Sequence, residues 1–323
     1  MSFAKKALLV SSVLALGAGM SASAAEKLNG AGASFPAKIY QRWFADLAKS
    51  GGPQVNYQAV GSGSGRKAFI DQTVNFGASD DPMKKKDMAK VKRGVVQIPM
   101  VGGTIAFGYN KPGCDLKLTQ IQLAKIAYGT IQNWSEVGCG SGKMTWVHRS
   151  DGSGTTAGFT NSLSAFSPYW DIRVGRGKSV RWPGSNAVGA KGNSGIAGVI
   201  KNTPGAIGYL NYGYVKGSFQ QAAIQNKAGN YVRANAETSA AGLSQIKLDS
   251  KLRGTDANPA GANAFPIVSL TWILAEPGHK TDDVKAALRY MLSEDAQSKS
   301  DSLGYVPLPE DLRQKSLAAV ESL

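Results

Sequence analysis

Histidine and cysteine are scarce in this chain of 323 residues, with two of each. A zinc site with the usual four Cys and His ligands would have to use all of them, so the sequence predicts no structural zinc site. No run of about 18 consecutive apolar residues occurs, the length that a membrane-spanning helix needs. The 39 glycines follow no collagen-like period and the hydrophobic share of 42% is ordinary, which excludes a fibre and argues against a disordered chain.

Acidic residues are also few compared with basic residues. Lys and Arg number 37 against 22 Asp and Glu, which gives a formal net charge of +15. Such an excess favours an anionic ligand or partner. Because the basic residues are dispersed along the chain and export separates the protein from DNA, we expect no nucleic-acid partner. The length fits two domains at roughly 100 to 200 residues each, or one large domain.

The first 24 residues have the three parts of a secretory signal peptide. Lys5 and Lys6 precede an apolar run over residues 7–16, and Ala22-Ser23-Ala24 is typical of a cleavage site. We therefore expect export to the periplasm with removal of residues 1–24. No cysteine follows the cleavage site to carry a lipid, which favours a free periplasmic protein.

Cys114 and Cys139 are the two cysteines of the chain. An even pair in an oxidising compartment is typical of a disulfide, which we expect here. The alternative is two unrelated buried thiols.

A strand, a glycine-rich loop and a helix follow one another over residues 55–70. Residues 55–60 are typical of a strand, and we expect a loop over Gly61-Ser62-Gly63-Ser64-Gly65 and a helix from Arg66. Unpaired N–H groups and the helix dipole favour an anion at such a helix start. Neither nucleotide-binding template fits, since Arg66 stands where the dinucleotide pattern needs its third glycine. A tight surface turn is the alternative.

The same order of elements recurs around residue 150, with an arginine at the end of the strand. Residues 144–149 are typical of a strand and end in Arg149, and residues 157–165 are typical of a helix. Asp151 or Ser153 can cap that helix, while Ser153, Thr155 and the Gly154 amide can donate hydrogen bonds to an oxyanion. The alternative is a capped helix with Arg149 in a solvated salt bridge.

A third helix start lies near residue 36. Pro36 suits the first position of a helix, and Ser34 and the Phe35 amide would then lie just beyond its N-terminus. Three helix starts rich in glycine and hydroxyl groups can surround a small tetrahedral anion from several sides. We expect them to converge in the fold.

Asp80 is a carboxylate that would select among such anions. Monohydrogen and dihydrogen phosphate carry an O–H that can donate to a carboxylate, whereas sulfate at neutral pH has none. Asp80 would therefore accept a hydrogen bond from phosphate and repel sulfate. The alternative is that Asp80 and Asp81 are a turn pair before Pro82.

Taken together, these motifs resemble the phosphate-binding proteins of bacterial phosphate ABC transporters, the PstS family. The stretches that carry the resemblance run in the family's order along the chain: residues 30–36, 56–63, 76–80, 149–155, 180–183, 191–193, 204–209 and 305–309. The resemblance implies an α/β fold, the two-lobed type II periplasmic-binding-protein fold, with the ligand cleft between the lobes. Lobe I would be residues 25–101 plus 269–323, and lobe II residues 102–268, which contain both cysteines.

The resemblance also implies a set of phosphate-contacting residues. Asp151 would orient the arginine, and the contribution of Ser64 stays open because some relatives have a different order of residues after Ser62. The implied contacts are Ser34, the Phe35 amide, Ser62, Asp80, Arg149, Ser153, the Gly154 amide and Thr155.

The implied function is high-affinity periplasmic binding of inorganic phosphate and delivery to the membrane permease of an ATPase-driven transporter. Such a receptor needs no cofactor or metal, and we expect a monomer that is not an enzyme. One alternative is a receptor for another oxyanion such as sulfate, against which Asp80 argues. Another is an exported phosphatase with Ser62 or Ser153 as nucleophile, which would need a base or metal nearby.

Overall fold

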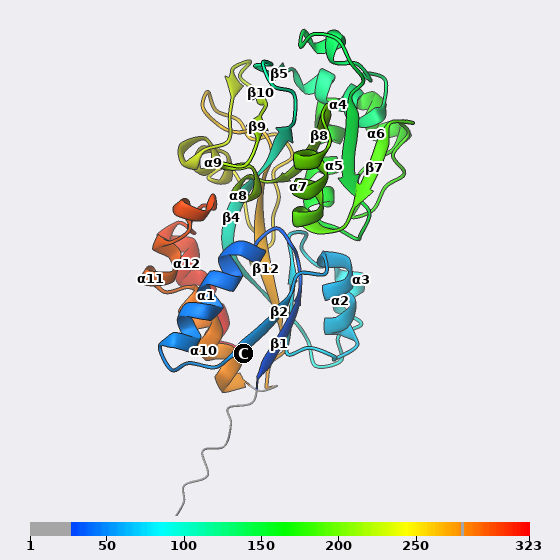
Figure 1. Cartoon of the computed structure of the whole chain (residues 1–323). Coiled ribbons are helices and arrows are strands. Elements are labelled where there is room, and N and C mark those ends of the chain that lie inside the picture. Colours follow the sequence, from blue (N-terminus) through cyan, green and yellow to red (C-terminus); the bar gives the residue numbers. More distant parts are fainter. Residues whose placement is uncertain (1–26, 279–280) are drawn as a thin grey trace, which may run out of the picture.

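The computed structural model describes residues 27–278 and 281–323, so the predicted signal peptide, residues 1–24, lies outside the described residues. Figure 1 shows an elongated molecule of two lobes, each with strands flanked by helices. The chain crosses between the lobes along β4 (Val96–Tyr109) and β12 (Val268–Ala275). The predicted two-lobed α/β fold is confirmed.

Lobe I contains both ends of the described chain. Its strands lie in the order β2-β1-β3-β12-β4, with β1 parallel to β2 and β3, and β12 antiparallel to β3 and β4. Besides the two crossing strands, its elements are β1 (Leu28–Gly32), α1 (Ala37–Lys49), β2 (Val55–Gln58), α2 (Ser62–Ile70), β3 (Phe76–Ser79), α3 (Lys85–Met88), α10 (Thr281–Met291), α11 (Glu294–Ser298), the 3-10 helix Asp301–Leu303 and α12 (Glu310–Glu321).

Lobe II is one continuous stretch of chain. The sheet continues from β4 in the order β8-β6-β7, with β6 parallel to β7 and β8, and a small second sheet has the order β11-β10-β5. Its elements are β5 (Lys117–Leu118), α4 (Gln120–Tyr128), the 3-10 helix Trp134–Val137, β6 (Thr145–Arg149), α5 (Gly154–Phe166), α6 (Pro168–Arg173), β7 (Ala187–Ala190), α7 (Gly192–Asn202), β8 (Ala206–Asn211), α8 (Tyr212–Val215), β9 (Gln220–Gln221), β10 (Ala223–Gln225), β11 (Tyr231–Val232) and α9 (Ala236–Leu243).

Strand β4 belongs to both lobes. Residues 96–104 pair with β12, and residues 105–109 pair with β8. Every residue of β4 after Val96 is buried, which explains its nearly continuous apolar sequence. The predicted lobe boundaries, after residues 101 and 268, fall within β4 and β12, and their exact positions stay a prediction.

Helix α1 packs one apolar face on the core of lobe I. The residues at helical spacing, Ile39, Tyr40, Trp43, Phe44 and Leu47, are all buried. The indole Nε1 of Trp43 donates to the carbonyl oxygen of Ala296, 2.6 Å away, which ties α1 to α11. Pro36 is the residue just before the helix rather than its first residue.

The Cys114–Cys139 pair forms a disulfide between positions 25 residues apart in lobe II. The predicted pairing is therefore confirmed. It links the chain before β5 to the chain just after the 3-10 helix Trp134–Val137.

No helix in the part of the chain that the structure describes is long and apolar enough to cross a membrane.

Candidate functional site

The fold brings predicted site residues from both lobes into contact. Ser62 is the first residue of α2 in lobe I, and Gly154 is the first residue of α5 in lobe II. The Gly154 amide donates to Ser62 Oγ at 3.1 Å, and the Gly63 amide donates to the Gly152 carbonyl at 2.7 Å. Two helix N-termini, one from each lobe, therefore meet at one place, where the positive ends of both helix dipoles favour an anion.

The helix α2 begins four residues before the position predicted from the sequence. Gly61 precedes the helix with φ of 92°, and the glycine-rich stretch forms its first turn instead of a loop. A side chain at Gly61 is excluded, because a Cβ there would lie 2.2 Å from Asp151 Oδ2. Ser64 is exposed, so the structure places it outside the buried site.

Arg149 is held by Asp151, the residue that the resemblance assigns to this task. The Arg149 Nε donates to Asp151 Oδ1 at 2.6 Å, and Nη2 pairs with Oδ2. Burial acts to raise the pKa of Asp151, but the hydrogen bond and positive charge of Arg149 outweigh it and lower that pKa overall. Arg149 Nη1 contacts Thr155 Oγ1 at 3.5 Å, so the guanidinium extends toward the start of α5.

Asp80 follows β3 and is 2% exposed. Its Oδ1 has no hydrogen-bond partner among the described residues. Burial raises the pKa of Asp80 to about 7, with Thr271 and Arg149 acting in the opposite direction and Asp81 adding to the rise. A buried carboxylate oxygen without a partner is an acceptor for an O–H or N–H donor from a ligand.

Four hydroxyl groups of the predicted site share one arrangement. Each oxygen accepts N–H hydrogen bonds from the protein, and none donates its own proton to a described residue. A hydroxyl has one proton to donate besides its acceptor lone pairs. The four groups are Ser34 (from Asn193 N, 3.0 Å), Ser62 (from Gly154 N, 3.1 Å), Ser153 (from Thr156 N, 3.0 Å) and Thr155 (from Asn193 Nδ2, 3.2 Å).

Ser153 also settles which residue caps α5. Its side chain accepts from the Thr156 amide, as an N-cap residue does, whereas Asp151 is occupied by Arg149 and by the Gly192 amide. The predicted helix is longer at its N-terminus than the sequence pattern indicates, since Gly154 and Thr155 already belong to it.

Asn193 and Tyr209 are site residues to which the sequence assigned no role. Asn193 Nδ2 donates to Ser34 Oγ at 3.0 Å and to Thr155 Oγ1 at 3.2 Å, which joins the two lobes. The hydroxyl of Tyr209 accepts from the Arg149 amide at 3.1 Å. Gly192-Asn193 at the start of α7 was the available signal, because this is one more helix N-terminus.

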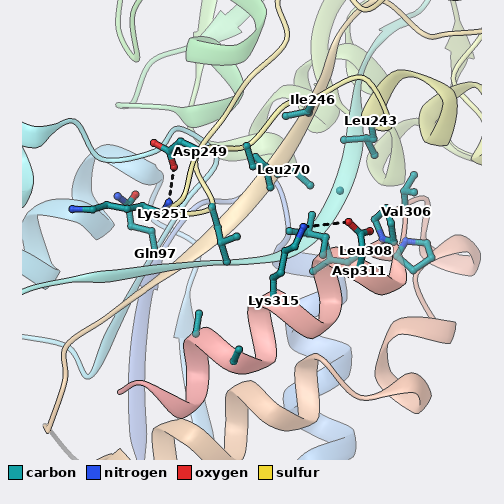
Figure 2. A pocket seen from close by; sticks show the side chains of 18 of the residues that line it. Gln97, Leu243, Ile246, Asp249, Lys251, Leu270, Val306, Leu308, Asp311 and Lys315 are labelled. Atoms are coloured by element: carbon teal, nitrogen blue, oxygen red, sulfur yellow. Dashed lines mark hydrogen bonds and ion pairs between the residues drawn. The ribbon is translucent and has the colours of Figure 1, made fainter.

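Two pockets lie near the crossing strands, and only one of them reaches the site. A pocket of about 480 Å³ is lined by Asp80 and also by Arg66 and Lys178. Figure 2 shows a larger one, of about 1170 Å³, lined by apolar residues such as Leu243, Leu270 and Leu308. The larger pocket includes none of the predicted site residues. No group of three or more His, Cys, Asp or Glu within the described ranges is arranged to hold a metal ion.

The fold and the paired helix starts define a two-lobed binding protein. The family model described as the PBP superfamily domain matches residues 19–295, so this is the class to which the chain belongs. A relative named phosphate-binding protein PstS from Pasteurella multocida is 38% identical over 311 residues, covering 90% of this chain and 89% of its own. Its namesake from Haemophilus influenzae is 37% identical, with 89% and 90% covered. The chain belongs to the PstS family.

Solved structures share the fold at lower sequence identity. A phosphate-binding protein from Stenotrophomonas maltophilia has a TM-score of 0.72 at 22% identity, covering 91% of this chain and 93% of that one. A putative phosphate ABC transporter substrate-binding protein with bound phosphate, from Clostridium perfringens, has a TM-score of 0.68 at 18% identity, covering 88% and 100%. At 18% and 22% identity, these similarities show the fold alone.

Proposed function

We propose that this protein binds inorganic phosphate between its lobes and delivers it to the membrane permease of a phosphate ABC transporter. The observation that carries the proposal is the balance of hydrogen-bonding groups at the site. Four buried hydroxyls, on Ser34, Ser62, Ser153 and Thr155, have protons left to donate, while Asp80 Oδ1 is a buried acceptor without a partner in the described chain. A tetrahedral anion that carries a proton matches many donors and a single acceptor.

In this proposal Arg149 supplies the positive charge, held in place by Asp151. The sequence also predicts the Phe35 and Gly154 amides as donors. In the structure the Gly154 amide donates to Ser62 Oγ at 3.1 Å, so it would have to exchange this partner for the anion. The site residues come from both lobes, so the bound anion contacts lobe I and lobe II together and favours their closure. Phosphate binding accords with the names of the relatives, and export to the periplasm accords with the predicted signal peptide. The free monomeric state is a prediction from the sequence.

A role without catalysis is supported by the surroundings of the two candidate nucleophiles. Ser62 and Ser153 accept hydrogen bonds from backbone amides. His148 has its Nδ1 3.0 Å from the Arg149 carbonyl oxygen and stacks on Trp182. A serine nucleophile needs a base within hydrogen-bonding reach, and in the described chain neither serine has a histidine partner.

Calorimetric titration of the mature protein, stripped of phosphate by unfolding and refolding, tests the proposal. We expect one phosphate per chain, with sulfate giving no competing heat at the same concentration. The variant Ser62→Ala should weaken phosphate binding, whereas the exposed Ser64→Ala is its matched control and should leave it unchanged. If the refolded wild-type protein binds no phosphate, the proposed function is wrong.

Delivery is a separate step and needs a separate measurement. In cells that lack the chain but keep the permease, phosphate uptake at low external phosphate should be restored by the wild-type chain and not by a variant defective in binding. Normal restoration by such a variant would refute the proposed delivery role.

A further inference from the structure

Arg66 is a buried arginine of α2 outside the predicted site. It is 4% exposed and lies one helical turn after Ser62, on the same side of the helix. It also lines the pocket that Asp80 lines. A buried arginine is costly unless its donors are used, so its partners indicate what it does.

The partners of Arg66 flank Asp80 on both sides. Its Nη2 donates to Ser79 Oγ at 3.0 Å and to the Asp81 carbonyl oxygen at 2.6 Å. The same nitrogen lies 3.1 Å from Asp81 Oδ2, and Nη1 lies 3.6 Å from Asp87 Oδ2. Arg66 therefore ties together the residues before and after Asp80.

The backbone of Asp80 is held from two other directions. Its amide donates to Ser62 Oγ at 3.3 Å, and its carbonyl oxygen accepts from Ser269 Oγ at 3.2 Å. Together with the bonds of Arg66 to Ser79 and Asp81, these contacts hold the turn over residues 79–81 from three directions. The carboxylate oxygen Oδ1 of Asp80 has no partner among the described residues and is available to a ligand. Arg149, and not Arg66, is the cation that lowers the pKa of Asp80.

We propose that Arg66 is a positioning residue that holds Asp80 in the orientation that distinguishes protonated phosphate from sulfate. The proposal rests on the phosphate-binding function proposed above. Arg66 acts through the turn over Ser79, Asp80 and Asp81, because its hydrogen bonds go to the residues on either side of Asp80. Without Arg66, the turn keeps the hydrogen bonds of the Asp80 backbone to Ser62 and Ser269 but loses those of the guanidinium. The carboxylate is then held less firmly toward the ligand, so it accepts less well from the phosphate O–H and repels sulfate less.

A double-mutant cycle between Arg66→Met and Asp80→Asn tests this role. The ratio of sulfate to phosphate dissociation constants is measured by competition in the wild type, both single variants and the double variant. We expect Arg66→Met to reduce the ratio by roughly tenfold, a factor typical of losing a hydrogen bond at a buried site. In the double variant, Arg66→Met should change the ratio of Asp80→Asn by less than about twofold. The reason is that Asp80, the residue through which Arg66 acts, is already altered.

Two further variants keep the test informative. Lys67→Met removes the neighbouring lysine, whose side chain is 76% exposed, and is the matched control that should leave the ratio unchanged. If Arg66→Met does not fold, Ser79→Ala removes one of its acceptors and should shift the ratio in the same direction by a smaller factor. Thermal melts establish that each variant is folded.

Two outcomes would overturn the role of Arg66. One is an unchanged ratio in folded Arg66→Met, which, with a lowered melting temperature, is what a purely structural arginine predicts. The other is a change of the same size whether or not Asp80→Asn is also present. Because the wild type is titrated first, absence of phosphate binding there would refute the proposed function and not this inference alone.

Discussion

Ser62 Oγ and the Gly154 nitrogen are 3.1 Å apart, although 92 positions separate them in the chain. Ser62 starts α2 in lobe I and Gly154 starts α5 in lobe II. The same hydroxyl oxygen also accepts from the Asp80 amide at 3.3 Å. One serine hydroxyl thus contacts both the start of α5 in the other lobe and the backbone of Asp80, the residue that we propose selects the ligand.

Gly154→Ala should abolish tight phosphate binding without unfolding the protein. A Cβ at Gly154 would lie 2.6 Å from Ser62 Oγ and 2.7 Å from Asp80 Cβ, so the lobes cannot reach the arrangement described here. Alanine is a better helix former than glycine, so lobe II itself should lose no stability. Titration calorimetry and thermal melts without phosphate measure the two effects. Gly198→Ala in α7, with nothing within 4 Å of the added Cβ, is the control and should bind normally.

Arg149→Ala should weaken phosphate binding at least about tenfold. Losing a charge-assisted hydrogen bond costs roughly 1.5 to 3 kcal/mol, and about 1.4 kcal/mol corresponds to a factor of ten. The variant also leaves the half-buried Asp151 without its cation, which adds repulsion for the anion. Isothermal titration measures the change, with the exposed Arg173→Ala in the same lobe as control. Unchanged affinity would remove Arg149 from the site.

Asp80→Asn should narrow the preference for phosphate over sulfate. The asparagine amide can donate to an unprotonated oxygen, and the substitution removes the negative charge that repels sulfate. Competition titrations of the two anions against each protein give the preference directly. The same preference in both proteins would show that another group selects the ligand.

Without phosphate, the stability of the protein should depend on the protonation of Asp80. Burial raises the pKa of this carboxyl to about 7 in the folded protein, against about 3.9 for an unfolded aspartate. The folded state therefore binds the proton more tightly, and the stabilisation that is fully present below about pH 4 is lost as the pH rises toward 7. Urea unfolding in phosphate-free buffers should show the wild type losing stability relative to Asp80→Asn over this range. Parallel pH curves for the two proteins would contradict the prediction.

The sequence predicted the elements whose pattern is local. The five apolar residues of α1 recur at helical spacing, and all of them are buried. The small hydroxyl residues at three helix starts were identified because caps and glycines have a local signature. The start of α2 was misplaced, because serine and glycine have weak helix propensity and only the contacts of Ser62 with Gly154 and Asp80 hold that first turn in place.

Residues that act on segments distant in the chain left no such local signature. Asn193 is the second residue of α7, and its role depends on hydrogen bonds to Ser34 and Thr155, which are distant in the chain. In the sequence, Arg66 served only to exclude the nucleotide-binding motifs. The fold places it beside the turn that contains Asp80. Such roles depend on which segments the tertiary fold brings together.

The position of β12 in the sheet has a consequence for the order in which the chain folds during synthesis. β12 lies between β3 and β4, yet it follows the whole of lobe II in the sequence. Until it emerges, β3 and β4 have open edges that no local segment can cover. We expect the contiguous lobe II to fold first, and lobe I to wait for its last strand and for helices α10 to α12. Long-range pairing of this kind is slow. During synthesis, lobe I should therefore expose its unpaired strand edges for longer than lobe II, and chaperones should bind it for longer.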